Sequence, residues 1–139
     1  RELARELIDT MRIRTASADT PIGTLSGGNQ QKAIIARWLM AGARILLLDE
    51  PTRGIDVGAR SEIYELIYRF AEDGGTVLFA SSDMPEVLGL ADRIVVMREG
   101  AVSGSLPRSE ATPERLLRLA LPEAGPVTAT QPEDKGMPT

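Results

Sequence analysis

The sequence contains no cysteine and no histidine among its 139 residues. Without cysteine, neither a disulfide framework nor a thiolate metal site can form. Without histidine, the most common general base of enzyme catalysis is missing as well. Acid–base chemistry must therefore be sought in other side chains.

Long apolar runs and an excess of positive charge are also lacking. No segment approaches the roughly 18 apolar residues that a membrane-spanning helix requires, and none resembles a signal peptide. Any membrane role is therefore expected to be peripheral. The 16 Lys and Arg residues are outnumbered by 20 Asp and Glu, which gives a net charge of −4. This balance argues against non-specific nucleic-acid binding, because that requires a basic surface.

An initiator methionine is missing at Arg1, where the pattern already indicates a helix. The sequence is therefore expected to be a fragment of a longer protein. Its hydrophobic share of 42% and charged share of 26% are ordinary for a soluble globular protein. The length suffices for one domain with a real core.

Hydrophobic periodicity predicts helices and strands in alternation. Ser26 is predicted to cap a largely apolar, buried helix that ends at Gly42. The short run 45–48 is typical of a parallel strand buried on both faces. Further strands are predicted at 76–80 and 94–97, with a turn at 99–100 that leads to 101–102, and further helices at 1–11, 63–70, 85–90 and 113–120.

This alternation predicts an α/β fold with a largely parallel sheet flanked by helices. The tail from Pro122 is rich in Pro, Gly and Thr and is predicted to be disordered. The expected division of the chain is 1–43, 44–105, a C-terminal helix within 106–121, and the tail 122–139.

Polar side chains follow the predicted strands, where ligands gather in open α/β sheets. Asp49 and Glu50 follow the first strand, and Ser81 and Ser82 follow the second. Paired acids in this place suit Mg²⁺ binding by Asp49 and the orientation or deprotonation of a water by Glu50. Taken alone, however, an Asp-Glu pair at a strand end is more often only the start of a loop.

Ser26-Gly27-Gly28 opens the predicted buried helix. Glycines let the backbone approach an oxyanion closely, free N–H groups point at it, and the helix dipole favours its charge. By itself this tripeptide is also an ordinary flexible turn, so it carries weight only in combination with other motifs.

The combination resembles the ATP-binding-cassette (ABC) ATPase family of P-loop NTPases. The segment 25–31, LSGGNQQ, is similar to the family's signature, and LLLDEPT at 46–52 is similar to its Walker B strand. RGID at 53–56 corresponds to the D-loop, and 81–97 to the switch region and the following strand. The sequence of these segments resembles the second half of ribose, xylose and galactose importer ATPases, in which two nucleotide-binding halves are fused in one polypeptide. The resemblance covers nearly everything before the tail.

This resemblance implies ATP and Mg²⁺ as ligands, with Asp49 on the metal and Glu50 as possible base. Asp56 would meet the opposing half. Each ATP would lie between the phosphate loop of one half and the signature of the other, so that the signature residues serve a nucleotide in trans: Ser26, Gly27, Gly28 and Gln30. Implied partners are the other half, a transmembrane permease and an extracytoplasmic sugar-binding protein, at the cytoplasmic face of the membrane.

Two family parts are missing. The sequence has no Gly-x-x-x-x-Gly-Lys-Ser/Thr phosphate loop, so this chain alone is expected to bind ATP poorly and not to hydrolyse it. The family's switch histidine falls at Ser82, which cannot act as a cationic partner of the γ-phosphate. The site of Asp49, Glu50 and Ser82 is therefore expected to hydrolyse slowly or to serve as structure.

Other functions stay open at this point. A nucleoside-type importer shares the fused-half design, and a catalytically incomplete dimerisation or regulatory module would also lack a phosphate loop. A cassette ATPase acting on DNA or ribosomes is disfavoured by the acidic balance. The sequence does not name the transported molecule.

Overall fold

The computed structural model describes residues 2–122. The predicted disorder of the tail falls, beyond Pro122, outside the described residues. The described residues divide into two compact units, 2–91 and 92–122. Each is considered by itself below.

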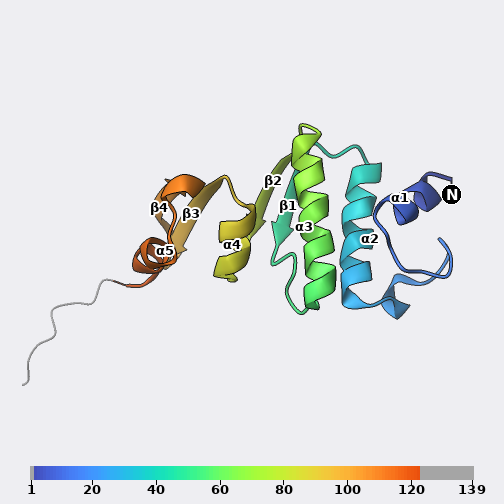
Figure 1. The fold of residues 1–139 in the computed structure, drawn as a ribbon, viewed down its shortest axis with the longest axis horizontal. Helices are drawn as coiled ribbons and strands as arrows, with labels where there is room; N and C mark the ends of the chain where they lie inside the picture. Colours follow the sequence, from blue (N-terminus) through green and yellow to red (C-terminus); the bar gives the residue numbers. More distant parts are fainter. Residues whose placement is uncertain (1, 123–139) are drawn as a thin grey trace, which may run out of the picture. The chain divides into compact units, whose positions relative to one another are not determined.

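Five helices or strands of the first unit agree closely with the periodicity of the sequence (Figure 1). They are α1 (Glu2–Thr10), α2 (Gly27–Met40), β1 (Ile45–Asp49), β2 (Thr76–Ala80) and α4 (Met84–Leu90). Helix α3 (Val57–Glu72) begins well before the predicted apolar face at Ile63, because Asp56 caps it. A short 3-10 turn, Ile22–Thr24, precedes α2.

Strands β1 and β2 form a parallel pair joined by the crossover helix α3. Their register runs from Ile45 opposite Thr76 to Asp49 opposite Ala80. A parallel pair needs such a crossover, and the crossover brings both carboxyl ends to one edge. Figure 1 shows α2 and α3 beginning at the end of the unit where β1 and β2 finish.

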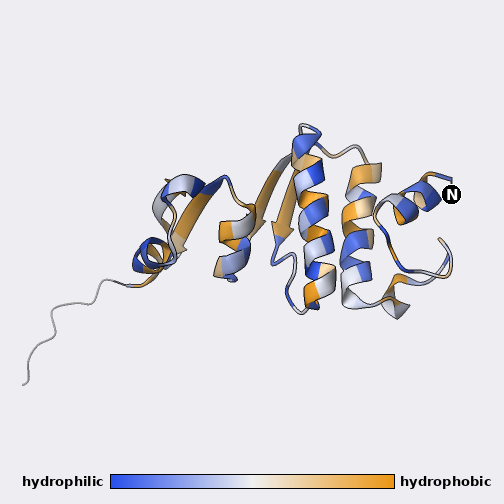
Figure 2. Ribbon diagram, viewed as in Figure 1, coloured by the Kyte–Doolittle hydropathy of each residue, from blue (hydrophilic) through white to orange (hydrophobic). Residues whose placement is uncertain are grey.

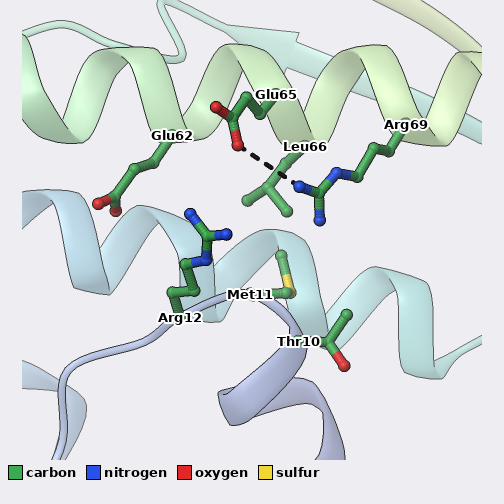
Figure 3. A pocket seen from close by; sticks show the side chains of 7 residues that line it. All are labelled: Thr10, Met11, Arg12, Glu62, Glu65, Leu66 and Arg69. Carbon is green, nitrogen blue, oxygen red and sulfur yellow. Dashed lines mark hydrogen bonds and ion pairs between the residues drawn. The ribbon is translucent and has the colours of Figure 1, made fainter.

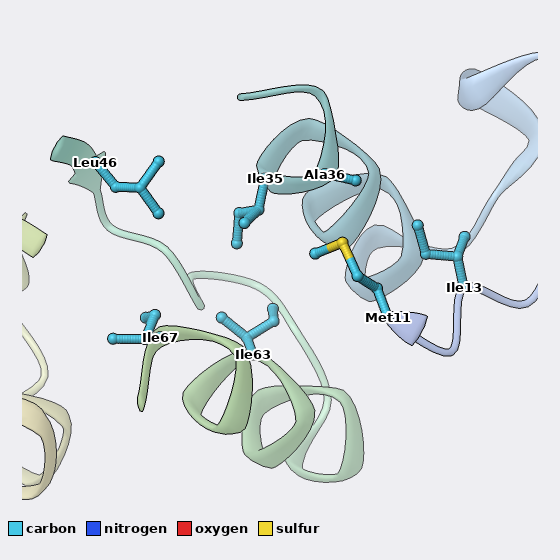
Figure 4. Packing of buried hydrophobic residues seen from close by; sticks show 7 residues of the cluster. All are labelled: Met11, Ile13, Ile35, Ala36, Leu46, Ile63 and Ile67. Atoms are coloured by element: carbon cyan, nitrogen blue, oxygen red, sulfur yellow. The ribbon is translucent and has the colours of Figure 1, made fainter. Parts of the chain in front are cut away.

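Apolar side chains from successive layers form the core of the first unit. Leu46 of β1 faces α3 and α2, and α2 in turn contacts the segment that follows α1 (Figure 4). Buried side chains of this kind each contribute about 1.5–3 kcal/mol relative to an exposed position. The cluster consists of Met11, Ile13, Ile35, Ala36, Leu46, Ile63 and Ile67.

The prediction that β1 is buried on both faces is wrong for the described chain. Leu46 is 4% exposed, but its neighbours Ile45 and Leu47 are 64% and 73% exposed. Side chains alternate between the faces of a strand, and within the described residues α2 and α3 cover only one face. Leu78 on β2 is likewise 65% exposed, so the strands that Figure 2 shows as hydrophobic have an uncovered side.

Helix α2 is also less buried than its composition predicts. Its buried residues are confined to one stripe, Gly28, Lys32, Ile35 and Ala36. The opposite side exposes Ile34, Trp38 and Met40 by almost half of their surface.

No described helix is both long and apolar enough to cross a bilayer.

A buried lysine fastens α2 to its two neighbours. Lys32 Nζ donates to Glu62 Oε2 on α3 over 2.6 Å and to the Arg12 carbonyl over 2.7 Å. The lysine side chain is 2% exposed and that of Glu62 31%. These hydrogen bonds make burial of the ammonium group tolerable. Nothing in the sequence pattern marks Lys32 for this role, since its partners are 20 and 30 residues away.

A shallow hollow lies beside this ion pair, between the end of α1 and α3 (Figure 3). Arg12 and Met11 point toward α3, where Glu65 and Arg69 form an ion pair of 3.5 Å. The volume of the hollow, about 10 Å³, holds at most one water molecule. The hollow is therefore no ligand site.

A glycine allows α2 and α3 to approach closely. A Cβ atom added at Gly28 would lie 2.4 Å from Cβ of Ala59 on α3 and 3.5 Å from Cγ2 of Ile55. Gly28 is itself buried. The glycine at this position therefore serves helix packing, in addition to any role toward a ligand.

The second unit is a hairpin with a helix packed on it. Strands β3 (Arg93–Arg98) and β4 (Ala101–Pro107) pair antiparallel and form a separate sheet, with a turn at Glu99 and Gly100. After the 3-10 turn Arg108–Glu110, helix α5 (Pro113–Ala120) coincides with the predicted helix. Thr112 caps it by accepting from Arg115 N–H, and Leu116 is buried.

We predict that Gly28→Ala destabilises the protein by about 1–2 kcal/mol, because overpacking costs more than the helix propensity that alanine adds. Urea unfolding of the purified protein measures the loss. Gly27→Ala is the matched control, since a Cβ at Gly27 meets nothing within 4 Å. Ala59→Gly introduced with Gly28→Ala should recover most of the loss. Equal stability of the Gly27 and Gly28 variants would contradict the close-packing argument.

The Lys32–Glu62 pair predicts a dependence of stability on pH. The hydrogen bond from Lys32 lowers the pKa of Glu62, and burial partly offsets this effect. Because the unfolded state binds the proton more tightly, the contribution of this carboxylate is present at neutral pH. It is lost as the pH falls below about 4.3 and through the folded-state pKa.

Glu62→Gln should therefore lower stability at pH 7 by about 1–2 kcal/mol and flatten its decline in acid. Thermal unfolding between pH 7 and pH 3 measures both effects. Glu65→Gln, which removes an exposed pair with Arg69, should change little. Parallel pH curves for wild type and Glu62→Gln would rule out the assignment.

Candidate functional site

The carboxyl ends of β1 and β2 bring two of the predicted site residues together. Glu50 N–H donates to the Ala80 carbonyl over 2.8 Å, which continues the strand pairing by one residue. The Glu50 carboxylate then accepts from Ser82 N–H over 3.0 Å. The first residue after β1 is thus hydrogen-bonded to the second residue after β2.

Glu50 has a strained backbone. Its φ of +46° lies in the left-handed region, which costs a non-glycine residue about 1–2 kcal/mol. A turn bond from Arg53 N–H to the Glu50 carbonyl, of 3.1 Å, holds this conformation. Arg12 and Glu99 have the same kind of backbone, with φ of +51° and +50°, so the contact with Ser82, and not the strain alone, distinguishes Glu50.

Asp49 occupies a different environment from its neighbour. It is exposed and, by strand alternation, lies on the uncovered face with Ile45 and Leu47. An exposed carboxylate at this edge suits one ligand position of Mg²⁺. The described residues contain no group of three acidic or histidine side chains able to hold a metal. A metal there would depend on oxygen atoms from a nucleotide and water.

Behind these residues lies a buried polar network that the sequence analysis missed. Thr52 Oγ1 donates to Glu86 Oε1 on α4 over 2.7 Å, and both residues are 2% exposed. Asp83 caps α4 by accepting from Glu86 N–H, and its other oxygen accepts from Arg60 of α3 over 2.8 Å. The network ties the loop after Glu50 to the helix that follows position 82.

Tyr64 of α3 adjoins the same network. Burial raises the pKa of its hydroxyl above the ordinary value, a hydrogen bond with Thr52 opposes this shift, and the nearby charge of Glu86 reinforces it. The hydroxyl therefore stays protonated and acts as a neutral hydrogen-bonding group. In the sequence, Thr52 is marked only by its place three residues after Asp49. No local signal identifies Glu86 or Tyr64.

Ser26-Gly27-Gly28 begins α2 with its three residues in different roles. Ser26 has the extended backbone of an N-cap, but its side chain makes no capping hydrogen bond; the predicted cap is therefore one of position only. Gly27 is exposed with open space around it, whereas Gly28 packs on Ala59. Gln30 donates its side-chain amide to the Leu25 carbonyl over 2.7 Å and thereby holds the turn before the helix.

Asp56 caps α3, with its Oδ1 accepting from Ala59 N–H over 2.9 Å. Because Ala59 also contacts Gly28, the start of α3 and the start of α2 are adjacent. The predicted signature and D-loop residues therefore belong to one packed corner of the first unit.

Neither of two surface hollows contains a predicted site residue. One is the small hollow of Figure 3, and the other, of about 400 Å³, lies along residues 15–19 and α1. The site residues instead lie on an open edge and at helix starts.

The sequence matches known proteins over most of its length. The family model described as ABC transporter matches residues 2–53. The arabinose import ATP-binding protein AraG 2 of Burkholderia cenocepacia is 57% identical over 88% of this chain and 24% of its own length. The ribose import ATP-binding protein RbsA 1 of Rubrobacter xylanophilus is 57% identical over 84% of this chain and 23% of its own. The chain thus spans about a quarter of the length of these relatives.

Solved structures share the fold. An inward-facing putative metal-chelate type ABC transporter superposes with a TM-score of 0.75 at 23% identity, over 85% of this chain and 47% of that chain. The dimeric structure of MJ0796, a bacterial ABC transporter cassette, superposes with a TM-score of 0.66 at 30% identity, over 77% and 46%.

We predict that Thr52→Val destabilises the protein by about 2–3 kcal/mol, because it leaves the buried Glu86 carboxylate without its hydroxyl donor. Chemical unfolding measures the effect. Thr52→Ser keeps the donor and should stay near wild type. The double variant Thr52→Val, Glu86→Leu should lose less than Thr52→Val alone, since no unpaired carboxylate then remains. A Thr52→Val protein as stable as wild type would refute the assigned role.

Proposed function

This chain belongs to the ABC transporter family, and we propose that it forms part of an ATP-binding subunit that drives uptake of a monosaccharide. The observation that carries the proposal is the 57% identity with arabinose and ribose import ATP-binding proteins over most of this chain. Identity at this level spans the signature-like segment, the Walker B-like strand and the switch-like region together.

In the proposed mode of action, Ser26, Gly27 and Gly28 serve an ATP bound by the opposing nucleotide-binding half. Open space around Gly27 and the uncapped start of α2 support this assignment, since both leave N–H groups available to a phosphate oxyanion. Gln30 supports the turn before them. A solved relative is a dimer of cassettes, which fits a site shared between two halves.

Asp49, Glu50 and Ser82 belong to the other proposed site, formed with the phosphate loop of their own half. Asp49 would bind Mg²⁺ together with phosphate oxygens. Glu50 would orient or deprotonate water, but Ser82 supplies no imidazole. The Glu50 carboxylate is also engaged by Ser82 N–H. We therefore expect this site to hydrolyse ATP slowly while the signature residues support turnover at the opposing site.

The proposed partners are the other nucleotide-binding half, a transmembrane permease and an extracytoplasmic sugar-binding protein. The proposed place is the cytoplasmic face of the cell membrane. Asp56 at the start of α3 would face the opposing half. A nucleoside-type importer is the second candidate, because its ATPases share the fused-half design, but the relatives' sugar-import names favour a monosaccharide.

We predict that Ser26→Ala lowers the ATPase rate of the assembled transporter by about 10²-fold, as expected for loss of one donor to a transition-state oxyanion. Glu50→Gln should leave a large part of the activity. ATPase rate and uptake of labelled arabinose and ribose are measured with the transporter reconstituted in vesicles. Equal loss from both changes would refute the asymmetry. Vesicles that take up a nucleoside and neither sugar would favour the second candidate.

A further inference from the structure

Asn29 connects the signature-like segment to the chain that follows α1. Its Oδ1 accepts from Arg14 N–H over 3.0 Å, and its Nδ2 donates to Ser26 Oγ over 2.9 Å. Asn29 is half-buried, whereas Ser26 is exposed. One amide side chain therefore joins a backbone group fifteen residues away to the serine hydroxyl.

The chemistry of the two partners fixes which way this amide points. A backbone N–H can only donate, so the group facing Arg14 must be the amide oxygen. The opposite side of the amide is then the NH₂ group, which can only donate, and Ser26 Oγ must accept from it. The orientation thus follows from the Arg14 bond and needs no further assumption.

This bond leaves the hydrogen of the Ser26 hydroxyl unused. A serine hydroxyl has one hydrogen to donate and two lone pairs; here a lone pair is occupied by Asn29 Nδ2. In most N-caps the serine oxygen would instead accept from a backbone N–H of the first turn, and that bond is absent here. The N–H groups at the start of α2 and the Ser26 O–H therefore all remain donors.

We propose that Asn29 is a positioning residue that holds the Ser26 hydroxyl as a donor toward an anionic phosphate oxygen. This inference rests on the proposed function, in which Ser26 serves the ATP of the opposing half. Asn29 donates to one lone pair of the oxygen, and no N–H group of the helix donates to the other, so the hydroxyl proton stays available to an acceptor outside the helix. Asn29 itself makes no contact with the nucleotide in this scheme.

A purely structural role for Asn29 has different consequences. If Asn29 only connected Arg14 to α2, its loss would lower the ATPase rate by the same factor with or without the Ser26 hydroxyl. If it acts through that hydroxyl, its loss should matter only while the hydroxyl is present. A double-mutant cycle between Asn29 and Ser26 therefore separates the two roles.

The experiment compares Asn29→Ala in the wild-type and Ser26→Ala backgrounds of the full-length protein, assembled with its permease. ATPase rate at saturating ATP and the KM for ATP are measured with radiolabelled ATP. We expect Asn29→Ala to lower the rate about tenfold when Ser26 is present and less than about twofold when it is absent. Glu65→Gln, at an exposed position of α3 outside the signature-like segment, should match wild type.

Asn29→Asp provides a second variant that keeps an acceptor for Arg14 N–H but loses the donor to Ser26. It should also lose activity only in the background that retains Ser26. An equal fractional loss in both backgrounds, for either variant, would overturn the positioning role, and so would a wild-type rate for Asn29→Asp.

The two proposals fail in distinguishable ways. A Ser26→Ala transporter with unchanged ATPase would overturn the proposed function and this inference with it. A strongly impaired Ser26→Ala transporter combined with a fully active Asn29→Ala transporter would overturn this inference alone. Thermal unfolding of each variant establishes that the compared proteins are folded.

Discussion

The close packing of α2 on α3 is the constraint on which the rest of the first unit depends. At the start of both helices the absence of a side chain at Gly28 admits Ala59, and one turn further the buried Lys32 reaches Glu62. Apolar contacts between Ile35, Ile63 and Leu46 extend the same interface to the sheet. Because the helices are fixed at this distance, the residues that precede them are fixed as well. The signature-like and D-loop-like segments therefore form one rigid corner.

A second, polar constraint organises the edge of the sheet. Thr52 donates a buried hydrogen bond to Glu86. This bond connects the loop after β1 to helix α4, which follows β2. Glu50 takes up a left-handed backbone within that frame and reaches Ser82 N–H. A buried carboxylate satisfied by a neutral hydroxyl is sensitive to any loss of its donor.

Local patterns predicted the elements well where the signal was itself local. Strand 76–80 and helix 113–120 have the observed limits, since turn residues and apolar periodicity bound them on both sides. The prediction failed where a distant partner decides the outcome. Burial of β1 on both faces needs a second covering layer, which the described residues lack. Ser26 accepts from Asn29, whose amide oxygen is bound by Arg14, and makes no capping bond. Lys32 and Glu86 gave no signal at all, because their partners lie 20 or more residues away.

The sequence by itself determined the α/β class, the order of the elements and the resemblance to ABC transporter ATPases. These depend on short motifs and on period, which are properties of neighbouring residues. Only the tertiary structure decided what each motif residue does: Gly27 faces open space while Gly28 packs on α3, Gln30 supports a turn, and Asp56 caps a helix. The physical reason is that a side chain's role depends on which donors, acceptors and Cβ atoms surround it. Those neighbours come from elements far apart in the chain, and folding alone brings them together.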